Sequence, residues 1–240
     1  MTVVCFDLDD TLYKEIDFLK SAYKEIAFYA AHIKVCSNVS QQVLANEAFD
    51  VMMDAYQKGD NAFEALNKYL GLAIPVSELL KMYRAHIPCI TLHNDVCYTL
   101  DKLKSMGILM GIVTDGREQT QWNKVRALGL TKWVDECCII INSSPEFFKP
   151  NSRGFECVEK AARDVTSQKD LNFVYVGDNL KKDFVYPKQK GWQTICLRND
   201  GRNIHEQNFE HAPKEALPDR IVEVFSDLIE MLFDEKGTEM

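Results

Sequence analysis

Short apolar runs that alternate with helix-patterned segments are the feature that most constrains how this chain folds. Runs rich in β-branched and other apolar residues, typical of strands buried on both faces, occupy residues 2–6, 108–113, 137–141, 172–176 and 193–197. Between the later runs, apolar residues recur at steps of three and four, as they do on one face of a helix. The alternation predicts βαβ units, and therefore an α/β fold with a parallel five-stranded sheet. Pro218 is expected to open a last helix that runs to Leu232.

Residues 13–88 contain no comparable strand-like run. Apolar residues there keep helical spacing through about four segments, one of which ends at Gly71, a typical helix stop. We therefore expect a helical bundle at 13–88, inserted into a Rossmann-like α/β core made of residues 1–12 and 89–240. Residues 199–217 are polar and irregular, and they are expected to form a surface loop.

Composition excludes several classes of protein. The chain is 46% hydrophobic and 27% charged, as expected for a globular protein with a sizeable core. Its net charge of −8 argues against binding to a nucleic acid polymer or to an anionic membrane surface. No apolar stretch approaches the length of a membrane span, and the first residues lack the pattern of a signal peptide. The eight cysteines include no CxxC pair, so we expect reduced thiols and a cytoplasmic location.

Chemically active residues follow the predicted strands. Carboxylates come after three of the runs, and a lysine comes after a fourth run and a loop. These residues are Asp7 and Asp9, Thr114 with Asp115 and Gly116, Lys149, and Asp178 with Asp183. The carboxyl ends of parallel strands share one edge of the sheet, where ligands bind. Clustered carboxylates repel one another, and a hard cation with oxygen ligands, such as Mg²⁺, would relieve that repulsion. A cation, a lysine and backbone amides exposed beside a glycine predict a site for a phosphoryl group.

These elements, in this order, carry a family resemblance. The pattern consists of Asp7-x-Asp9-x-Thr11, then Thr114, then Lys149, then Gly177-Asp178-x4-Asp183. It closely resembles the haloacid dehalogenase (HAD) superfamily of aspartate-nucleophile phosphatases, and the resemblance covers nearly the whole chain. The predicted helical insert lies where capped members of that superfamily insert a helical cap after the first strand.

The resemblance implies a role for each carboxylate. Asp7 would attack phosphorus and ligate Mg²⁺. Asp9 would act as general acid and then as general base, and its backbone carbonyl would bind the metal. A closed pocket and the nearby Asp7 are expected to raise the pKa of Asp9, while Mg²⁺ and Lys149 would oppose that rise. Asp178 would ligate Mg²⁺ directly, and Asp183 would support the metal site directly or through water. The motif alone gives Tyr13 no role.

The same resemblance implies a phosphate-binding set. Thr114 and the backbone amides near it, at Asp115 and Gly116, would hold the phosphoryl oxygens. Lys149 would neutralise the charges of the nucleophile and of the phosphoryl group. Lys182 is expected to be solvated.

The expected activity is magnesium-dependent hydrolysis of a small phosphorylated metabolite, a nucleoside monophosphate or a sugar phosphate, through an aspartyl-phosphate. Three alternatives stay open: a sugar-phosphate phosphotransferase or mutase, a dehalogenase, and a partner-binding protein with an idle site. Dehalogenases of this superfamily typically lack the second aspartate of the motif, so the presence of Asp9 argues against that alternative. Nothing in the sequence demands more than a monomer or a weak oligomer.

Overall fold

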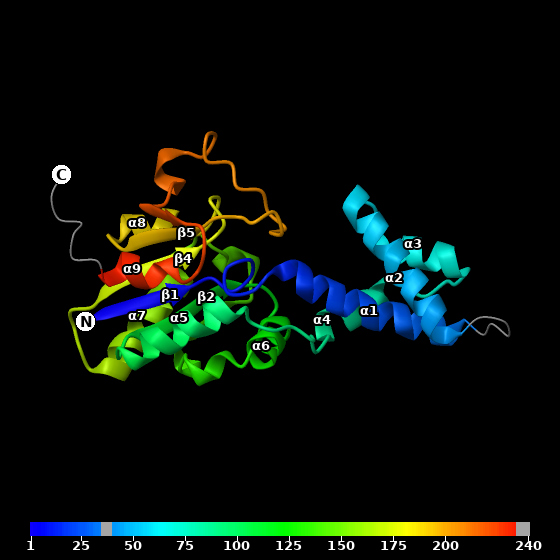
Figure 1. Ribbon diagram of the computed structural model, residues 1–240, viewed down its shortest axis with the longest axis horizontal. Helices are drawn as coiled ribbons and strands as arrows, with labels where there is room; N and C mark the ends of the chain where they lie inside the picture. The colour runs from blue at the N-terminus through cyan, green and yellow to red at the C-terminus, as the bar shows by residue number, and fades with distance from the viewer. Residues whose placement is uncertain (35–39, 234–240) are drawn as a thin grey trace. The chain divides into compact units, whose positions relative to one another are not determined.

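The computed structural model describes residues 1–34 and 40–233, and the chain divides into two compact units (Figure 1). The α/β unit consists of Met1–Glu15 and Thr91–Met240, and the helical unit consists of Ile16–Ile90. Residues 35–39, within the predicted bundle, and 234–240, within the predicted core range, lie outside the described residues. Within the described ranges, none of the helices combines the length and the apolar character that crossing a bilayer would require.

Over its described residues, the α/β unit is built on a parallel sheet of six strands in the order β3-β2-β1-β4-β5-β6. Its strands are β1 (Thr2–Phe6), β2 (Leu109–Asp115), β3 (Ile139–Asn142), β4 (Asn172–Gly177), β5 (Gln193–Leu197) and β6 (Arg220–Val222). The predicted α/β fold with a parallel sheet is therefore confirmed, but the predicted count of five strands is wrong.

The missed strand is β6, at the edge of the sheet. It has only three residues and pairs with β5, for example Cys196 with Ile221. So short a run carries no clear periodicity, and Pro218 before it resembles a helix start. The last helix, α9 (Asp227–Phe233), begins only after this strand.

The other differences between the predicted and the observed elements also lie at the ends of strands and helices. A 3₁₀ turn, Glu136–Cys138, precedes β3 where a strand was expected from residue 137. The helix expected at 181–190 is reduced to α8 (Val185–Gln189), because the residues before it form the turn that carries Asp183.

Helices cover both faces of the sheet. They are α5 (Asn94–Ser105), α6 (Glu118–Ala127), α7 (Arg153–Thr166), α8 and α9. On the α7 face, the fully buried Phe155 meets Tyr175 of β4 edge-on, with ring centroids 5.1 Å apart. On the opposite face, Phe6 of β1 stacks on Phe225 at 5.7 Å. A sheet covered on both faces explains why its strands are nearly continuous apolar runs.

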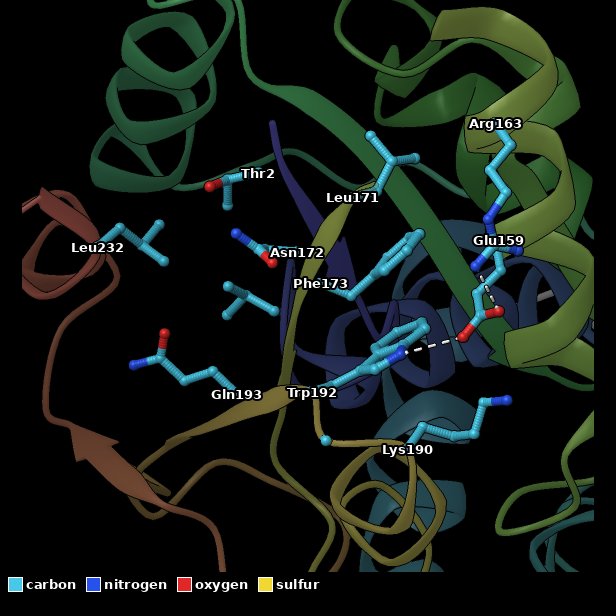
Figure 2. A pocket seen from close by; sticks show the side chains of 12 residues that line it. Thr2, Glu159, Arg163, Leu171, Asn172, Phe173, Lys190, Trp192, Gln193 and Leu232 are labelled. Carbon is cyan, nitrogen blue, oxygen red and sulfur yellow. Dashed lines mark hydrogen bonds and ion pairs between the residues drawn. The ribbon is translucent and has the colours of Figure 1, made fainter. Parts of the chain in front are cut away.

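Figure 2 shows a hollow at the amino ends of β1, β4 and β5, the end of the strands away from Asp7. Trp192 stacks on Phe173 there, with centroids 4.5 Å apart, and its Nε1 donates to Glu159 at 3.1 Å. Arg163 donates to the other oxygen of Glu159 at 3.0 Å. Among the described residues, Glu159 is the only carboxylate that lines this hollow, and it is already paired; its contacts secure α7 to the sheet.

Within its described residues the helical unit contains four helices, the first of which begins at the last residue of the α/β unit. They are α1 (Glu15–Ile33), α2 (Gln41–Lys58), α3 (Ala62–Leu70) and α4 (Val76–Ala85). Ser40 and Asn61 accept backbone N–H groups at the starts of α2 and α3, and Gly59 and Gly71 end these helices in the left-handed region. Small and aliphatic side chains fill its core, among them Ala30, Ala48, Met52, Leu66 and Leu79. The unit therefore has a core of its own.

Candidate active site

The register of the sheet brings the acidic residues together. Phe6 of β1 pairs with Val176 of β4, and the N–H of Asp7 donates to the carbonyl of Val176 at 2.9 Å. Asp7 and Asp178 therefore leave neighbouring strands at the same edge. Gly177 lets Asp183 approach, because a Cβ at residue 177 would lie 2.6 Å from a carboxylate oxygen of Asp183.

Three buried carboxylates form a cluster that fits a metal ion. One oxygen from each of Asp7, Asp178 and Asp183 lies within 4.8 Å of the other two. Asp7 Oδ2 is buried and has no hydrogen-bond partner in the described part of the chain. Buried polar atoms are rarely left unpaired, and Mg²⁺ prefers oxygen ligands. The orphaned oxygen and the all-oxygen donor set therefore suit Mg²⁺, with Asp7 and Asp178 as the side chains that would hold it.

The electrostatics of this cluster indicate a shortage of positive charge. Burial raises the pKa of Asp7 to about 6, with Asp183 adding to the rise and Lys149 opposing it. Burial, followed by the charges of Asp183 and Asp7, raises the pKa of Asp178 to about 9. Both shifts arise because ionised carboxylates are unfavourable when they are buried close together. A divalent cation would favour their ionised forms.

Lys149 is fully buried between the carboxylates. Its Nζ lies 2.7 Å from Asp7 Oδ1, 2.7 Å from Asp183 Oδ1 and 3.0 Å from the hydroxyl oxygen of Tyr175. The Tyr175 hydroxyl in turn donates to the carbonyl of Val113 at 3.2 Å. The ammonium group is thus held at a fixed point beside Asp7, where it opposes the charge of that carboxylate.

Both carboxylate oxygens of Asp183 accept hydrogen bonds. Oδ1 accepts from Lys149, and Oδ2 accepts the backbone N–H groups of Asp178 at 3.1 Å and Asn179 at 2.8 Å. These bonds shape the turn after β4 and so position Asp178. Whether Asp183 also contacts the metal, directly or through water, stays a prediction.

The residues after β2 also meet the lysine loop. Asp115 Oδ1 accepts from the Asn142 side chain at 2.9 Å and from the backbone N–H of Lys149 at 3.1 Å. The N–H of Gly116 donates to the carbonyl of Asn142 at 3.0 Å, and its φ of +143° is one that favours glycine. Thr114 is buried at the end of β2. The side chain of Asp115 and the amide of Gly116 therefore tie two loops together.

Asp9 is held by three side chains, none of which the motif had identified as functional. Tyr13 and Lys124 donate to Asp9 Oδ1 at 2.5 and 2.7 Å, and Gln121 donates to Asp9 Oδ2 at 2.8 Å. Gln121 also donates to Thr114 Oγ1 at 2.7 Å. We call Tyr13, Gln121 and Lys124 the Asp9 cage. Gln121 and Lys124 are polar, buried and three residues apart on α6, and that helical spacing is the only sequence signal that could have found them.

The cage reverses the expected shift of the Asp9 pKa. Burial alone would raise it, but the charge of Lys124 and the hydrogen bonds from Lys124, Tyr13 and Gln121 lower the Asp9 pKa below its ordinary value. The predicted rise was wrong because the sequence did not reveal a lysine at this carboxylate.

The loop expected only to cover the surface reaches into the site. Asn203 donates to Asp178 Oδ2 at 2.9 Å, and Lys14 donates to the amide oxygen of Asn203 at 2.7 Å. Gln207 donates to the backbone carbonyl of Asp178 at 2.8 Å. This loop therefore orients Asp178, a contribution that its irregular sequence did not signal.

Comparisons with known proteins indicate the family and the fold of this chain. Residues 1–184 match the model of a family described as haloacid dehalogenase-like hydrolase. A glyceraldehyde 3-phosphate phosphatase of Methanothermobacter thermautotrophicus is 28% identical over 240 residues, covering 97% of this chain and 100% of that protein. A HAD phosphatase from Thermococcus onnurineus has a TM-score of 0.57 at 19% identity, covering 97% of this chain and 98% of its own. A 2-haloacid dehalogenase from Pseudomonas syringae has a TM-score of 0.54 at 20% identity, with the same coverage, so these two structures support the fold alone.

Proposed function

This chain belongs to the haloacid dehalogenase-like hydrolases, as the match over residues 1–184 shows, and from that membership we propose that it hydrolyses a small sugar phosphate with Mg²⁺ through an aspartyl-phosphate on Asp7. The resemblance noted in the sequence is thereby confirmed at the level of the family. The metal requirement, the covalent route and the substrate belong to the proposal.

One observation carries the mechanism: Asp7 has one oxygen paired with Lys149, and its other oxygen is buried without a hydrogen-bond partner among the described residues. Its backbone follows a buried strand, so the carboxylate is held firmly, as an in-line attack on phosphorus would require. When bound, Mg²⁺ would supply the positive charge that lets a phosphoryl group approach Asp7. Lys149 opposes the charge of the carboxylate from the other oxygen, and Thr114 offers a hydroxyl to the phosphoryl oxygens.

Asp9 would serve both steps of hydrolysis. In the first step it gives a proton to the leaving oxygen, and in the second it takes one from the water that cleaves the aspartyl-phosphate. The Asp9 cage favours the ionised carboxylate, which is the form needed in the second step. Loading a proton for the first step has to work against the charge of Lys124.

The names of the relatives support the choice of substrate. The relative from Methanothermobacter thermautotrophicus is named for glyceraldehyde 3-phosphate, which favours a sugar phosphate over a nucleoside monophosphate. Phosphate release from glyceraldehyde 3-phosphate should therefore exceed release from nucleoside monophosphates when the purified enzyme is assayed with Mg²⁺. Asp7→Asn should abolish release, whereas Asp164→Asn, which alters an exposed carboxylate paired with Lys160, should leave it unchanged.

Two results would contradict the proposal. One is that a folded wild-type enzyme releases no phosphate from any sugar phosphate, and the other is that release persists in Asp7→Asn. Transfer of the phosphoryl group to a second sugar, in place of release, would favour the phosphotransferase alternative.

We also assign the helical unit, Ile16–Ile90, to substrate selection, as a cap. It has a core of its own, so replacing it with a short Gly/Ser linker should leave a folded α/β unit. The truncated enzyme should discriminate less between glyceraldehyde 3-phosphate and a generic aryl phosphate. An unchanged ratio of the two kcat/KM values in a folded truncation would show that the cap does not select. The cytoplasmic location and the weak or absent oligomerisation stay predictions.

A further inference from the structure

The side chain of Gln121 joins two residues that have different proposed roles. Its Nε2 donates to Asp9 Oδ2 at 2.8 Å and to Thr114 Oγ1 at 2.7 Å. Asp9 is the proposed acid and base, whereas Thr114 offers a hydroxyl to the phosphoryl group. A side-chain amide nitrogen carries two hydrogens, so these two bonds use both donors of Gln121. The glutamine therefore sets the spacing between the two side chains.

Packing holds Gln121 in this position. The residue lies on α6 and is buried. Its amide passes against the turn after β2, where a Cβ at residue 116 would lie only 3.1 Å from Gln121 Cδ. Gly116 therefore leaves the room that the amide occupies, in addition to supplying the φ that the turn needs. Close packing on this side gives the amide little freedom to move.

The carboxylate of Asp9 determines which end of the amide faces the site. Asp9 forms an ion pair with Lys124 at 2.7 Å, and an ionised carboxylate can only accept hydrogen bonds. The NH₂ group of Gln121, and not its oxygen, must therefore face Asp9. The same nitrogen reaches Thr114 Oγ1, so Thr114 accepts from Gln121. If the amide were reversed, its oxygen would instead take the hydroxyl hydrogen of Thr114.

This orientation leaves the Thr114 hydroxyl with a hydrogen to donate. Among the described residues, the structure shows no hydrogen bond in which Thr114 Oγ1 is the donor. A hydroxyl that accepts from an amide becomes a better donor, because hydrogen bonds in a chain polarise one another. The oxygens of a phosphoryl dianion are acceptors, and a hydrogen bond to a charged acceptor is among the strong ones. The buried hydroxyl is thus prepared to donate to a phosphoryl group.

On these grounds we propose that Gln121 is a positioning residue, which keeps the Thr114 hydroxyl available as a donor to the phosphoryl group and holds it at a fixed spacing from Asp9. The inference rests on the proposed phosphatase function and deepens it. Gln121 acts through Thr114 on the bound phosphoryl group and through Asp9 on the leaving oxygen. One buried amide thereby aligns the two ends of the bond that is cleaved.

Three substitutions on α6 test this role. Gln121→Met keeps the length of the side chain and removes both hydrogen bonds. Gln121→Glu keeps the shape, but its carboxylate would accept the Thr114 hydrogen and repel Asp9. Gln119→Met is the matched control, because Gln119 is an exposed glutamine on the same helix.

The readout is the affinity for inorganic phosphate, measured by calorimetry in the presence of Mg²⁺. Gln121→Met should weaken phosphate binding by about 3- to 10-fold, the value of one net hydrogen bond. Gln121→Glu should weaken it by more than about 10-fold, because it also takes the hydroxyl hydrogen that phosphate needs. Gln119→Met should change the affinity by less than about twofold.

A double-mutant cycle separates positioning from a purely structural role. Thr114→Val removes the hydroxyl with little change in shape, and each glutamine variant is also made in this background. Because Gln121 is inferred to act through that hydroxyl, Gln121→Met should change phosphate affinity by less than about twofold in the Thr114→Val background. A structural defect would weaken binding equally in both backgrounds.

The binding measurement does not depend on which substrate is hydrolysed. Weaker phosphate binding in the Gln121 variants supports the inference even if glyceraldehyde 3-phosphate is not a substrate. Three results would overturn it: equal affinity in folded Gln121→Met and Gln119→Met, an equal loss with and without the Thr114 hydroxyl, or no phosphate binding by the wild type. If Gln121→Met does not fold, Gln121→Glu decides by the same comparisons.

Discussion

Replacing Asp178 with asparagine tests the proposed metal site without changing the size of a side chain. The variant removes one of three buried carboxylates whose oxygens lie within 4.8 Å of one another. An asparagine can still accept a hydrogen bond from Thr11 or Asn203, which now donate to the two oxygens of Asp178. The loss of one such bond, about 1 kcal/mol, is offset by relief of the repulsion among the carboxylates. Metal-free stability should therefore change little.

In the Asp178→Asn variant, the stabilisation that Mg²⁺ provides should change much more than the metal-free stability does. A ligand present at about 100 times its Kd adds about 2.7 kcal/mol to the free energy of unfolding. For a chain of this size, about 1 kcal/mol shifts Tm by roughly 2–4 °C, so saturating Mg²⁺ should raise the wild-type Tm by roughly 5–11 °C. Asp178→Asn removes a charged ligand, and its rise in Tm should fall below about 2 °C.

Thermal unfolding followed by circular dichroism, in excess chelator and in Mg²⁺, measures the metal-free stability and the rise in Tm that Mg²⁺ causes. Asp164→Asn is the control, because Asp164 is an exposed carboxylate that pairs with Lys160 away from the cluster. It should keep the full wild-type rise. If Asp178→Asn gained as much Tm from Mg²⁺ as the wild type does, the cluster would not be the metal site and the reasoning from the orphaned Asp7 oxygen would fail.

The remaining predictions concern the nucleophile, the Asp9 cage and the core. Hydrolysis of a substrate made chiral at phosphorus with oxygen isotopes should proceed with overall retention of configuration, because attack by Asp7 and then by water each inverts phosphorus, and net inversion would refute a covalent intermediate. Tyr13→Phe removes a 2.5 Å hydrogen bond to Asp9. Steady-state assays should therefore show a change in kcat of about tenfold, with little change in the rise of Tm that Mg²⁺ causes. An unchanged kcat would exclude Tyr13 from the reaction. Phe155→Ala should lower the free energy of unfolding by about 3–5 kcal/mol in urea titrations, because Phe155 is fully buried. A loss below about 1 kcal/mol would contradict the packing of α7 on the sheet.

The parts of the site that the sequence predicted are those fixed by strand ends. Apolar runs stop where the chain leaves the sheet, so Asp7 and Asp178 could be assigned to one edge before their distance was known. The register of β1 and β4 then brings them together. Lys149 lies seven residues beyond β3, and its approach to Asp7 could be expected only from the family resemblance.

What the sequence did not predict depends on contacts between distant segments. Asn203 lies in a stretch without periodicity, and its bond to Asp178 joins residues 25 positions apart. The cage residues Gln121 and Lys124 are 112 and 115 positions from Asp9. Their spacing places both side chains on one face of α6, but spacing alone does not indicate that they contact a carboxylate.

The Asp9 cage shows why a residue's place in a motif does not determine its protonation state. Tyr13 remains a donor, because burial and the charge of Asp9 raise its own pKa well above the usual value. An ionised carboxylate offers about four lone-pair positions, so the three donors of the cage leave one that can carry a proton. The charge of Lys124 nevertheless favours the ionised form of Asp9. If Asp9 acts as we propose, the cage therefore favours the form that the base step needs, and the proton for the acid step has to be loaded against the charge of Lys124.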